Sequence, residues 1–259
     1  MLRKIILAVK SIKNLHILIL DFLGFFKRDA IYKLRNGIHI VARGGSADYA
    51  EIIIINADSE YPSRFFPRNI RPVILDIGAH IGVFSLLITK KLSCKNPSIF
   101  AIEPGSSNYS YLEKNVRLNN FRCIKSFKLA MTGKTGKGFL FLNGNKYDGC
   151  FVGMRKNDLL ACEKISTISL EDFCKAHNIS IVDLMKMDIE GSEYDVFESS
   201  INFIKKHVRS IFVELHNIDK NRNYLTFKNY IVKHGFSIDV EIMNRTLFLR
   251  NNKLKNEKI

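Results

Sequence analysis

Residues 73–85 read VILDIGAHIGVFS, and this stretch decides the fold of the chain. It predicts an apolar β-strand that runs into Asp76, then a glycine turn, then a helix. Gly78 permits the tight turn, and Gly82 allows close packing of helix and strand. The backbone N–H groups of this loop, which includes Ala79, and the helix N-terminus are expected to face a ligand. Such units often bind nucleotide-like cofactors, although some hold no ligand.

The glycine spacing argues against a dinucleotide cofactor. The dinucleotide pattern is G-x-G-x-x-G, but His80 stands where its middle glycine would lie. Glu103 ends the next predicted strand, in SIFAIEPG, and its carboxylate can accept the protons of both ribose hydroxyls. Acids at two strand ends suit a cofactor with a cationic amino-acid part and a ribose. S-adenosylmethionine meets that description.

Three motifs follow one another along the chain: DIGAHIGVFS, AIEPGSSNYSYLEKNVRLNN and DLMKMDIEGSEYDVF. Together they resemble the FkbM family of S-adenosylmethionine-dependent methyltransferases, whose members usually carry Asn at the position of His80. YKLRNGIHIVARGGSADY also resembles the family's N-terminal segment, so the resemblance covers about residues 31–235. It implies a cofactor site made by Asp76, Gly78, Ala79, Gly82 and Glu103, with Pro104 shaping the loop and Met131 beside the adenine.

The chain from residue 71 to residue 259 predicts one α/β domain. Strands alternate with amphipathic helices, which specifies a doubly wound, Rossmann-like sheet with right-handed crossovers. Seven strands are expected, at 73–77, 98–103, 124–130, 184–188, 211–214, 237–242 and 246–250. Helices are expected near 81–92, 106–119, 170–177, 192–206 and 222–234. The last strand is expected to run antiparallel, a class I methyltransferase trait by resemblance. Residues 137–154 are expected to be an insertion that covers a substrate cleft.

Residues 1–70 predict an N-terminal extension of helices and a β-hairpin. Charges interrupt the apolar residues 1–28, so no run approaches the roughly 20 residues of a spanning helix, and no secretory cleavage site follows. We expect one or two helices that pack against the domain or a partner subunit, and contact with a membrane surface stays open. Asn36-Gly37 indicates a type I′ hairpin turn, and EIIII at 51–55 a buried strand or a helix start.

Composition limits the partners and the compartment. Lys and Arg outnumber Asp and Glu by 40 to 25, which gives a formal charge of +15 that would attract phosphates, anionic glycans or acidic lipids. The cations are scattered, so a solubilising surface is an equal alternative. The 5 cysteines form no C-x-x-C pair, which argues against a disulfide framework and a zinc site and favours the cytoplasm, with a peripheral membrane location as the alternative. No metal is expected, and a homo-oligomer stays open.

Two predicted strand ends carry the candidate catalytic residues. Asp188 and Glu190 follow one strand in KMDIEG, and His216 follows the next. Ligands of open α/β sheets bind outside such carboxyl ends. Asp188 is expected nearest the transferring methyl, where it would orient the substrate hydroxyl or hold the cofactor's ammonium group, with a helix N-cap as the structural alternative. His216 has the ordinary pKa of a general base, with a structural histidine as the alternative.

The resemblance implies an O-methyltransferase that acts on a hydroxyl of a sugar in a glycan, a lipid-linked saccharide or a related secondary metabolite. RNA is an alternative acceptor because of the positive charge, but no RNA-binding module or aromatic stacking motif is visible, so a nucleic-acid partner is not expected. A non-catalytic cofactor-binding protein that works at a membrane surface or in protein interactions is the third hypothesis. The retained acids at the strand ends argue against it.

Overall fold

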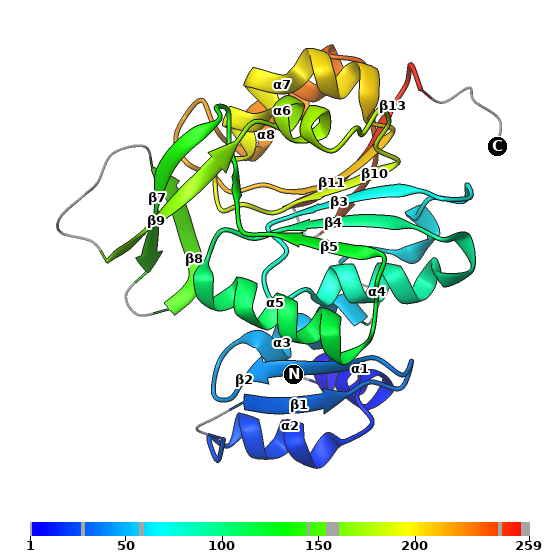
Figure 1. The fold of residues 1–259 in the computed structure, drawn as a ribbon, viewed down its shortest axis with the longest axis vertical. Helices are drawn as coiled ribbons and strands as arrows, with labels where there is room; N and C mark the ends of the chain where they lie inside the picture. Colours follow the sequence, from blue (N-terminus) through cyan, green and yellow to red (C-terminus); the bar gives the residue numbers. More distant parts are fainter. Residues whose placement is uncertain are drawn as a thin grey trace.

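The computed structural model describes residues 2–26, 29–56, 60–143, 146–153, 161–242 and 245–254. Its main element is a seven-stranded sheet in the order β12-β13-β11-β10-β3-β4-β5 (Figure 1). The strands are β3 (Val73–Ile77), β4 (Ser98–Ile102), β5 (Ile124–Phe127), β10 (Leu184–Met187), β11 (Ser210–Glu214), β12 (Phe236–Ile242) and β13 (Thr246–Asn251). β13 is antiparallel to both of its neighbours, whereas β11, β10, β3, β4 and β5 pair in parallel. The predicted doubly wound sheet with an antiparallel last strand is confirmed.

Helices cover both faces of this sheet (Figure 1). One face carries α4 (Val83–Lys91) and α5 (Ser106–Leu118), and the other carries α6 (Leu170–Ala176), α7 (Glu193–His207) and α8 (Tyr224–Lys233). Successive residues of a strand point to opposite faces, so Ile74 joins one buried cluster and Leu75 the other. Burial on both faces explains why these strands read as continuous apolar runs.

A smaller sheet in the order β6-β9-β7-β8 stands beside the main one (Figure 1). It consists of β6 (Ala130–Met131), β7 (Gly136–Asn143), β8 (Lys146–Gly153) and β9 (Cys162–Ile168). The prediction of one strand over 124–130 was wrong, because β5 ends at Phe127 and Ala130 pairs with Thr167 of β9 instead. The inserted strands predicted within 137–154 are β7 and β8, apart from residues 144, 145 and 154, which lie outside the described residues.

The N-terminal segment forms two helices, a hairpin and a third helix. These are α1 (Leu2–Ser11), α2 (Leu15–Phe22), β1 (Asp29–Lys33), β2 (His39–Arg43) and α3 (Asp48–Asn56). A first 3-10 turn at Ser63–Phe65 follows α3, and a second at Ser93–Lys95 follows α4. EIIII is therefore helical, and the hairpin is confirmed. Among the described residues, no helix is long and apolar enough to cross a membrane.

The turn of the hairpin differs from the predicted type I′ form. Gly37 has a φ of 89° and its N–H donates to the Leu34 carbonyl at 3.1 Å, while the Leu34 N–H donates to Ile38 at 2.8 Å. Asn36 does not adopt the left-handed conformation that a type I′ turn requires. The loop thus has three residues and ends in a left-handed glycine, the common alternative for hairpins of this length.

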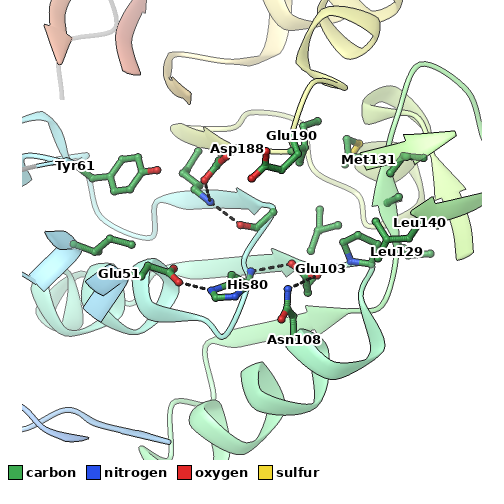
Figure 2. Close-up of a pocket in the computed structure, with 18 of the residues that line it drawn as sticks. Glu51, Tyr61, His80, Glu103, Asn108, Leu129, Met131, Leu140, Asp188 and Glu190 are labelled. Atoms are coloured by element: carbon green, nitrogen blue, oxygen red, sulfur yellow. Dashed lines mark hydrogen bonds and ion pairs between the residues drawn. The ribbon is translucent and has the colours of Figure 1, made fainter. Parts of the chain in front are cut away.

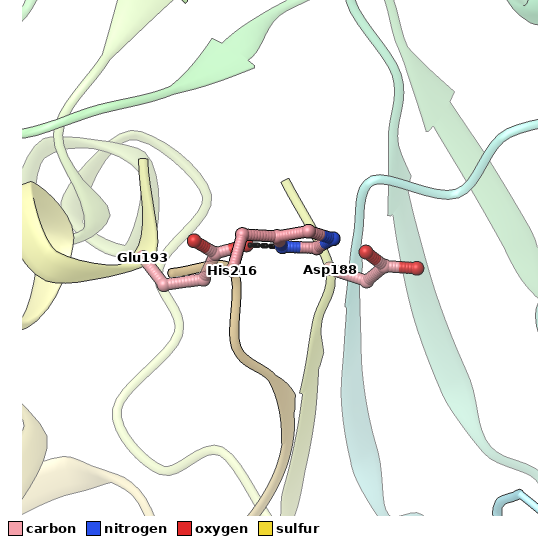
Figure 3. Close-up of side chains that lie close together, drawn as sticks. All are labelled: Asp188, Glu193 and His216. Carbon is pink, nitrogen blue, oxygen red and sulfur yellow. Dashed lines mark hydrogen bonds and ion pairs between the residues drawn. The ribbon is translucent and has the colours of Figure 1, made fainter. Parts of the chain in front are cut away.

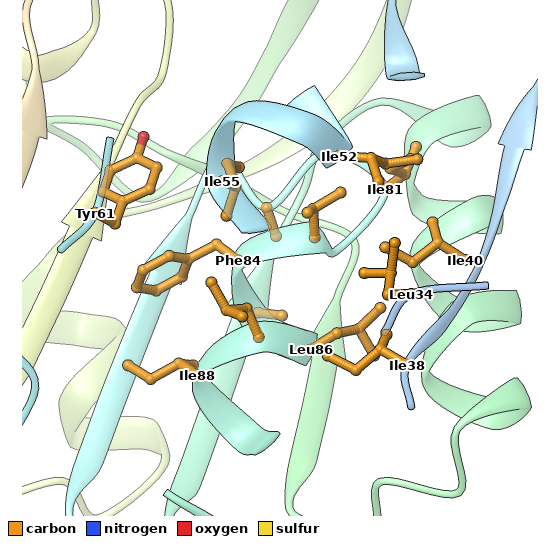
Figure 4. Packing of buried hydrophobic residues seen from close by; sticks show 14 of the residues in the cluster. Leu34, Ile38, Ile40, Ile52, Ile55, Tyr61, Ile81, Phe84, Leu86 and Ile88 are labelled. Atoms are coloured by element: carbon orange, nitrogen blue, oxygen red, sulfur yellow. The ribbon is translucent and has the colours of Figure 1, made fainter. Parts of the chain in front are cut away.

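The N-terminal segment shares a hydrophobic core with the main domain (Figure 4). Ile40 of the hairpin and Ile52 of α3 pack in one cluster with Ile81, Phe84 and Leu86, which belong to the glycine loop and α4. The division predicted near residue 70 stays a prediction, and the apolar contacts run across it.

Two side-chain amides, one in α5 and one directly after it, form hydrogen bonds with the edge strand of the hairpin. The Asn115 Oδ1 accepts the Val41 N–H at 2.7 Å, and its Nδ2 donates to the carbonyls of Val41 at 3.0 Å and Ile81 at 2.9 Å. Asn119 pairs in the same way with the N–H and C=O of His39, at 2.8 and 2.7 Å. These side chains satisfy backbone groups of β2 as a neighbouring strand would, and they fix the hairpin beside the glycine loop.

Asn115→Ala should lower the free energy of unfolding by about 3 kcal/mol, because it leaves one N–H and two carbonyl groups buried without partners. Urea denaturation would measure the change. Arg117→Ala, an exposed substitution on the same helix, is the control and should change stability by less than about 0.5 kcal/mol. Equal effects of the two substitutions would show that the hairpin does not depend on the Asn115 amide.

Candidate functional site

A cavity of about 350 Å³ opens at the carboxyl ends of β3, β4 and β10 (Figure 2). Such a position is where open α/β sheets bind ligands. Three loops that follow these strands, the small sheet, α3 and the segment before the first 3-10 turn all contribute to its wall. The polar lining residues are Glu51, Glu60, Tyr61, His80, Glu103, Asn108, Lys186, Asp188 and Glu190. The apolar lining includes Ile54, Ile55, Leu129, Met131, Leu140 and Val152.

The loop after β3 requires glycine at two positions. Gly78 has a φ of 77°, and a Cβ atom there would overlap the Asp188 carbonyl oxygen. Gly82 has a φ of 91°, and its Cβ would lie 2.6 Å from Leu112 of α5. The first glycine therefore lets the loops after β3 and β10 touch, and the second lets α4 start against α5.

The N–H groups of this loop are used within the protein. Gly78 and Ala79 both donate to the Ile102 carbonyl, at 2.9 and 3.0 Å, and Gly82 donates to Ala79 at 2.8 Å. The His80 N–H donates to the Glu103 carboxylate at 2.9 Å. The expectation that these N–H groups face a ligand was therefore wrong. The loop offers the cavity its Gly78 edge and the His80 ring.

Glu103 is held at the cavity wall by three donors. Besides His80, the Gly105 N–H donates to its carboxylate at 2.9 Å and the Asn108 Nδ2 at 3.3 Å. Two carboxylate oxygens have about four acceptor positions, so the group keeps capacity for a ligand hydroxyl. Figure 2 shows Glu103 and Asn108 on one side of the cavity, with Asp188 and Glu190 opposite.

Lys186 joins the glycine loop to the loop after β10. Its buried Nζ donates to the Gly78 carbonyl at 2.6 Å and lies 3.7 Å from Asp76 and 3.8 Å from Asp188. Burial by itself lowers the pKa of Lys186, but Asp188, Asp76 and more distant acids outweigh burial and raise it, so the ammonium stays charged. No spacing or periodicity in the sequence indicated a role for this lysine.

Asp76 lies behind the loop and does not line the cavity. The Ser85 hydroxyl donates to its Oδ2 at 2.6 Å, and its buried Oδ1 has no hydrogen-bond partner and faces Lys186. Burial raises the pKa of Asp76, and Lys186 and Ser85 oppose that shift. The carboxylate therefore supports the loop from the sheet side.

The N-terminal segment reaches the site through α3 and β2. The His80 ring lies between Glu51, which contacts its Nδ1, and Arg43, whose Nη2 is 2.8 Å from its Nε2. Arg43 is in turn held by both oxygens of Asp48, at 2.7 and 3.0 Å, and donates to the Asn108 Oδ1 at 2.8 Å. This network fixes His80 and, through Asn108, the Glu103 carboxylate.

Glu60 is an acid of the cavity that the sequence interpretation missed. It precedes Tyr61 in the SEYP segment, where no periodic pattern marks it as part of a site. Burial, and after it the nearby Asp188, raises the pKa of Glu60 to about 7. Burial and Asp188 also raise the pKa of Glu190, against the charge of His216. Two carboxyl groups with raised pKa values thus face Asp188.

His216 is not among the residues that line the cavity, and Figure 3 shows its ring between the carboxylates of Glu193 and Asp188. Its Nδ1 lies 3.0 Å from Glu193 and its Nε2 lies 3.3 Å from Glu190. Burial alone would lower the pKa of His216, but Glu193, Glu190 and Asp188 raise it to about 9. The imidazole is therefore protonated at neutral pH, which argues against its predicted use as a base.

Asp188, Glu193 and His216 could in principle hold a metal ion, since one ligand atom from each lies within 4.8 Å of the others. Glu193 is already engaged, because its carboxylate accepts the N–H groups of Ile189 at 3.0 Å and Gly191 at 2.8 Å. A metal would have to break the contact between Glu193 and His216. Glu193 therefore stabilises the loop after β10 through these N–H groups and its ion pair with His216.

The structure divides the predicted site residues into two groups. The cavity wall includes Gly78, Glu103, Pro104, Met131, Asp188 and Glu190. Asp76, Ala79, Gly82 and His216 support that wall from outside it. The cofactor and catalytic roles of all ten stay predictions.

A family model described as the methyltransferase FkbM domain matches residues 76–239. "Methyltransferase 1" of Beauveria bassiana (strain ARSEF 2860) is 23% identical over 188 residues, which cover 65% of this chain and 73% of that protein. "Methyltransferase sdnD" of Sordaria araneosa is 27% identical over 196 residues, covering 64% and 73%.

A solved structure gives the same fold. The crystal structure of a methyltransferase FkbM from Methylobacillus flagellatus KT superposes with a TM-score of 0.53 at 15% identity, over 78% of this chain and 53% of that one. This chain thus spans about half the length of that protein.

His216 should titrate near pH 9 in the folded protein, above its ordinary value of about 6.5. Because folding raises this pKa, the stability that it contributes is fully present below about pH 6.5 and is lost as the pH rises through about 9. NMR titration of the ring would measure the shift. Glu193→Gln should move the pKa down, whereas Glu198→Gln, an exposed change on the same helix, should leave it in place. A wild-type value near 6.5 would contradict the ion pairs of His216 with Glu193 and Glu190.

Proposed function

The chain belongs to the FkbM methyltransferase domain family and is an S-adenosylmethionine-dependent methyltransferase, and we propose that its acceptor is a hydroxyl of a sugar. The sugar would belong to a glycan, a lipid-linked saccharide or a related secondary metabolite. The observation that carries this proposal is the set of carboxyl groups around Asp188 at the cavity wall. Carboxylates orient hydroxyl groups and accept their protons.

The cavity fits the cofactor that the family uses. Glu103 has acceptor capacity for ribose hydroxyls, and the apolar Leu129, Met131 and Leu140 offer a surface for the adenine ring. The opposite wall is acidic, which suits the cationic sulfonium and ammonium groups. Asp76 would act on this site through Lys186 and the glycine loop.

The charge of the lining favours a neutral acceptor over RNA. Five carboxyl groups line the cavity, those of Glu51, Glu60, Glu103, Asp188 and Glu190, and Lys186 is paired with two acids. A phosphate close to this wall would be repelled. The formal charge of +15 keeps RNA as the alternative acceptor, since the outer surface would attract a polyanion.

S-adenosylmethionine supplies an electrophilic methyl group when it is bound. The acceptor oxygen loses its proton as it gains that methyl, and a carboxylate of the cavity must take the proton. Glu60 has the better-matched acidity, because its pKa is raised to about 7. Asp188, held by Lys186 at 3.8 Å, would orient the hydroxyl.

Transfer of a labelled methyl group tests the proposal. Purified protein and methyl-labelled S-adenosylmethionine would be incubated with a panel of oligosaccharides and, separately, with total RNA. Label in a saccharide, located on oxygen by mass spectrometry, would support the proposal. Label found only in RNA would transfer the assignment to the alternative.

Glu103→Gln should weaken S-adenosylmethionine binding by at least about tenfold, because one charged acceptor for the ribose is lost. Isothermal titration calorimetry with the cofactor and with S-adenosylhomocysteine would measure it. Glu171→Gln, a change at an exposed glutamate, is the matched control and should bind normally. Unchanged affinity in Glu103→Gln would remove the ribose assignment.

Glu60→Gln and Asp188→Asn should each lower kcat by about 100-fold while S-adenosylhomocysteine binds within a few-fold of normal. If Glu60 takes the proton, kcat/KM of the wild type rises with pH through about 7, where this carboxyl ionises. That rise should be absent from Glu60→Gln and retained, at lower rates, in Asp188→Asn. A Glu60→Gln enzyme with the wild-type pH profile would assign the base elsewhere.

A further inference from the structure

The first two helices lie at the end of the molecule opposite α7 and α8, and apolar side chains are exposed on them (Figure 1). Phe22 is 71% exposed, Phe25 70%, Leu23 60% and Ile19 57%. We call this set, together with the exposed Ile6, Val9 and Leu20, the N-terminal apolar surface. Single exposed apolar residues are ordinary, but seven within 20 residues of chain are a marked concentration.

The helix α2 buries its acidic residue and exposes several apolar ones, unlike an ordinary surface helix. Its one acid, Asp21, is buried, where its carboxylate contacts the Tyr32 hydroxyl and accepts the Gly45 N–H at 2.6 Å. Ile19 and Phe22, on either side of it in sequence, point outward. A surface helix normally turns its apolar face to the core and its charges to water. In α2, Leu15, Ile17 and Leu18 pack against the core, while Ile19, Leu20 and Phe22 are exposed.

The backbone holds the exposed aromatic residues in place. The Gly24 N–H donates to the Asp21 carbonyl and the Phe25 N–H to Leu20, both at 2.9 Å, and Gly24 has a φ of 75°. This pair of bonds is a Schellman C-cap, which fixes the chain just beyond the helix. Phe25 is therefore presented by a defined turn that continues from α2.

Among the described side chains of residues 6–26, the exposed formal charges are positive. Asp21 is the only acid among residues 1–28, whereas the same segment contains the cations Arg3, Lys4, Lys10, Lys13, Lys27 and Arg28. Lys10 and Lys13, at the end of α1 and just beyond it, are exposed. Exposed apolar groups with cations beside them match the two layers of an anionic bilayer, its acyl boundary and its headgroups.

We propose that the N-terminal apolar surface docks the enzyme on an anionic lipid bilayer, with Phe22, Leu23 and Phe25 in the acyl boundary and Lys10 and Lys13 at the headgroups. A second copy of the chain fits less well. Symmetric pairing of this surface would bring the same cations of two molecules together without an exposed acid from the segment between them. The inference rests on this surface alone and is independent of the acceptor.

Vesicle co-sedimentation of the full chain tests the proposal. The protein should sediment with phosphatidylcholine vesicles that contain about one third phosphatidylglycerol, and much less with pure phosphatidylcholine. The triple variant Phe22→Ser, Leu23→Ser, Phe25→Ser should bind at least about tenfold more weakly, because the inserted apolar area is lost. Lys10→Glu with Lys13→Glu should cause a similar loss on the anionic vesicles.

Leu225→Ser with Val232→Ser is the matched control. These residues of α8 are 65% and 55% exposed and belong to the opposite end of the molecule (Figure 1). The control should sediment like the wild type, and circular dichroism should show every variant folded, since only exposed side chains are changed. Absence of wild-type sedimentation, or equal losses in the control, would overturn the proposal. A dimer in sedimentation velocity that the triple variant abolishes, without vesicle binding, would reassign the surface to self-association.

Discussion

The site depends on the contacts that the buried ammonium of Lys186 makes. It donates to the Gly78 carbonyl at 2.6 Å and lies within 4 Å of Asp76 and Asp188, so one charge connects the strand, the glycine loop and the loop after β10. Two neighbouring carboxylates in a buried position would otherwise repel each other and lose hydration. The lysine charge offsets this repulsion and opposes the rise in the pKa of Asp76 that burial causes. The close approach of the Gly78 and Asp188 backbones, which excludes a Cβ at Gly78, follows the same geometry.

A second network extends this arrangement into the N-terminal segment. Arg43 and Glu51 hold the His80 ring, and Asn108 transmits the contact to Glu103. The amides of Asn115 and Asn119 anchor the same hairpin from α5. Because residues on both sides of position 70 share one hydrophobic cluster, packing of the N-terminal segment stabilises the glycine loop. His80 is then understandable in a place where the family usually has Asn, since its ring reaches both partners.

The sequence was sufficient for the main sheet because its strands are buried on both faces. A run such as VILDI has few alternatives, and the observed β3 has the predicted bounds. Residues 128 and 129 were mistaken for strand, and Ala130 belongs to another strand, β6, whose partner β9 comes more than 30 residues later. The acidity of Glu60 and the charge of His216 could not be predicted from the sequence for a similar reason. Each acquires its chemistry from acids on other loops, the first from Asp188 and the second from Glu193 and Glu190, and no local spacing encodes those distances.

The cavity and the rest of the molecule carry charge of opposite sign. Acids gather at the cavity, so the rest of the molecule must carry more than the formal net charge of +15. A phosphate-binding site would have cations in the cavity wall that are available to the ligand. Lys186 lies in this wall, but its ammonium already contacts Gly78, Asp76 and Asp188. Lys10 and Lys13 are exposed, and the described side chains of residues 6–26 include no exposed acid. The acidic cavity fits the proposed neutral acceptor, and the exposed cations beside apolar residues fit the proposed contact with an anionic bilayer.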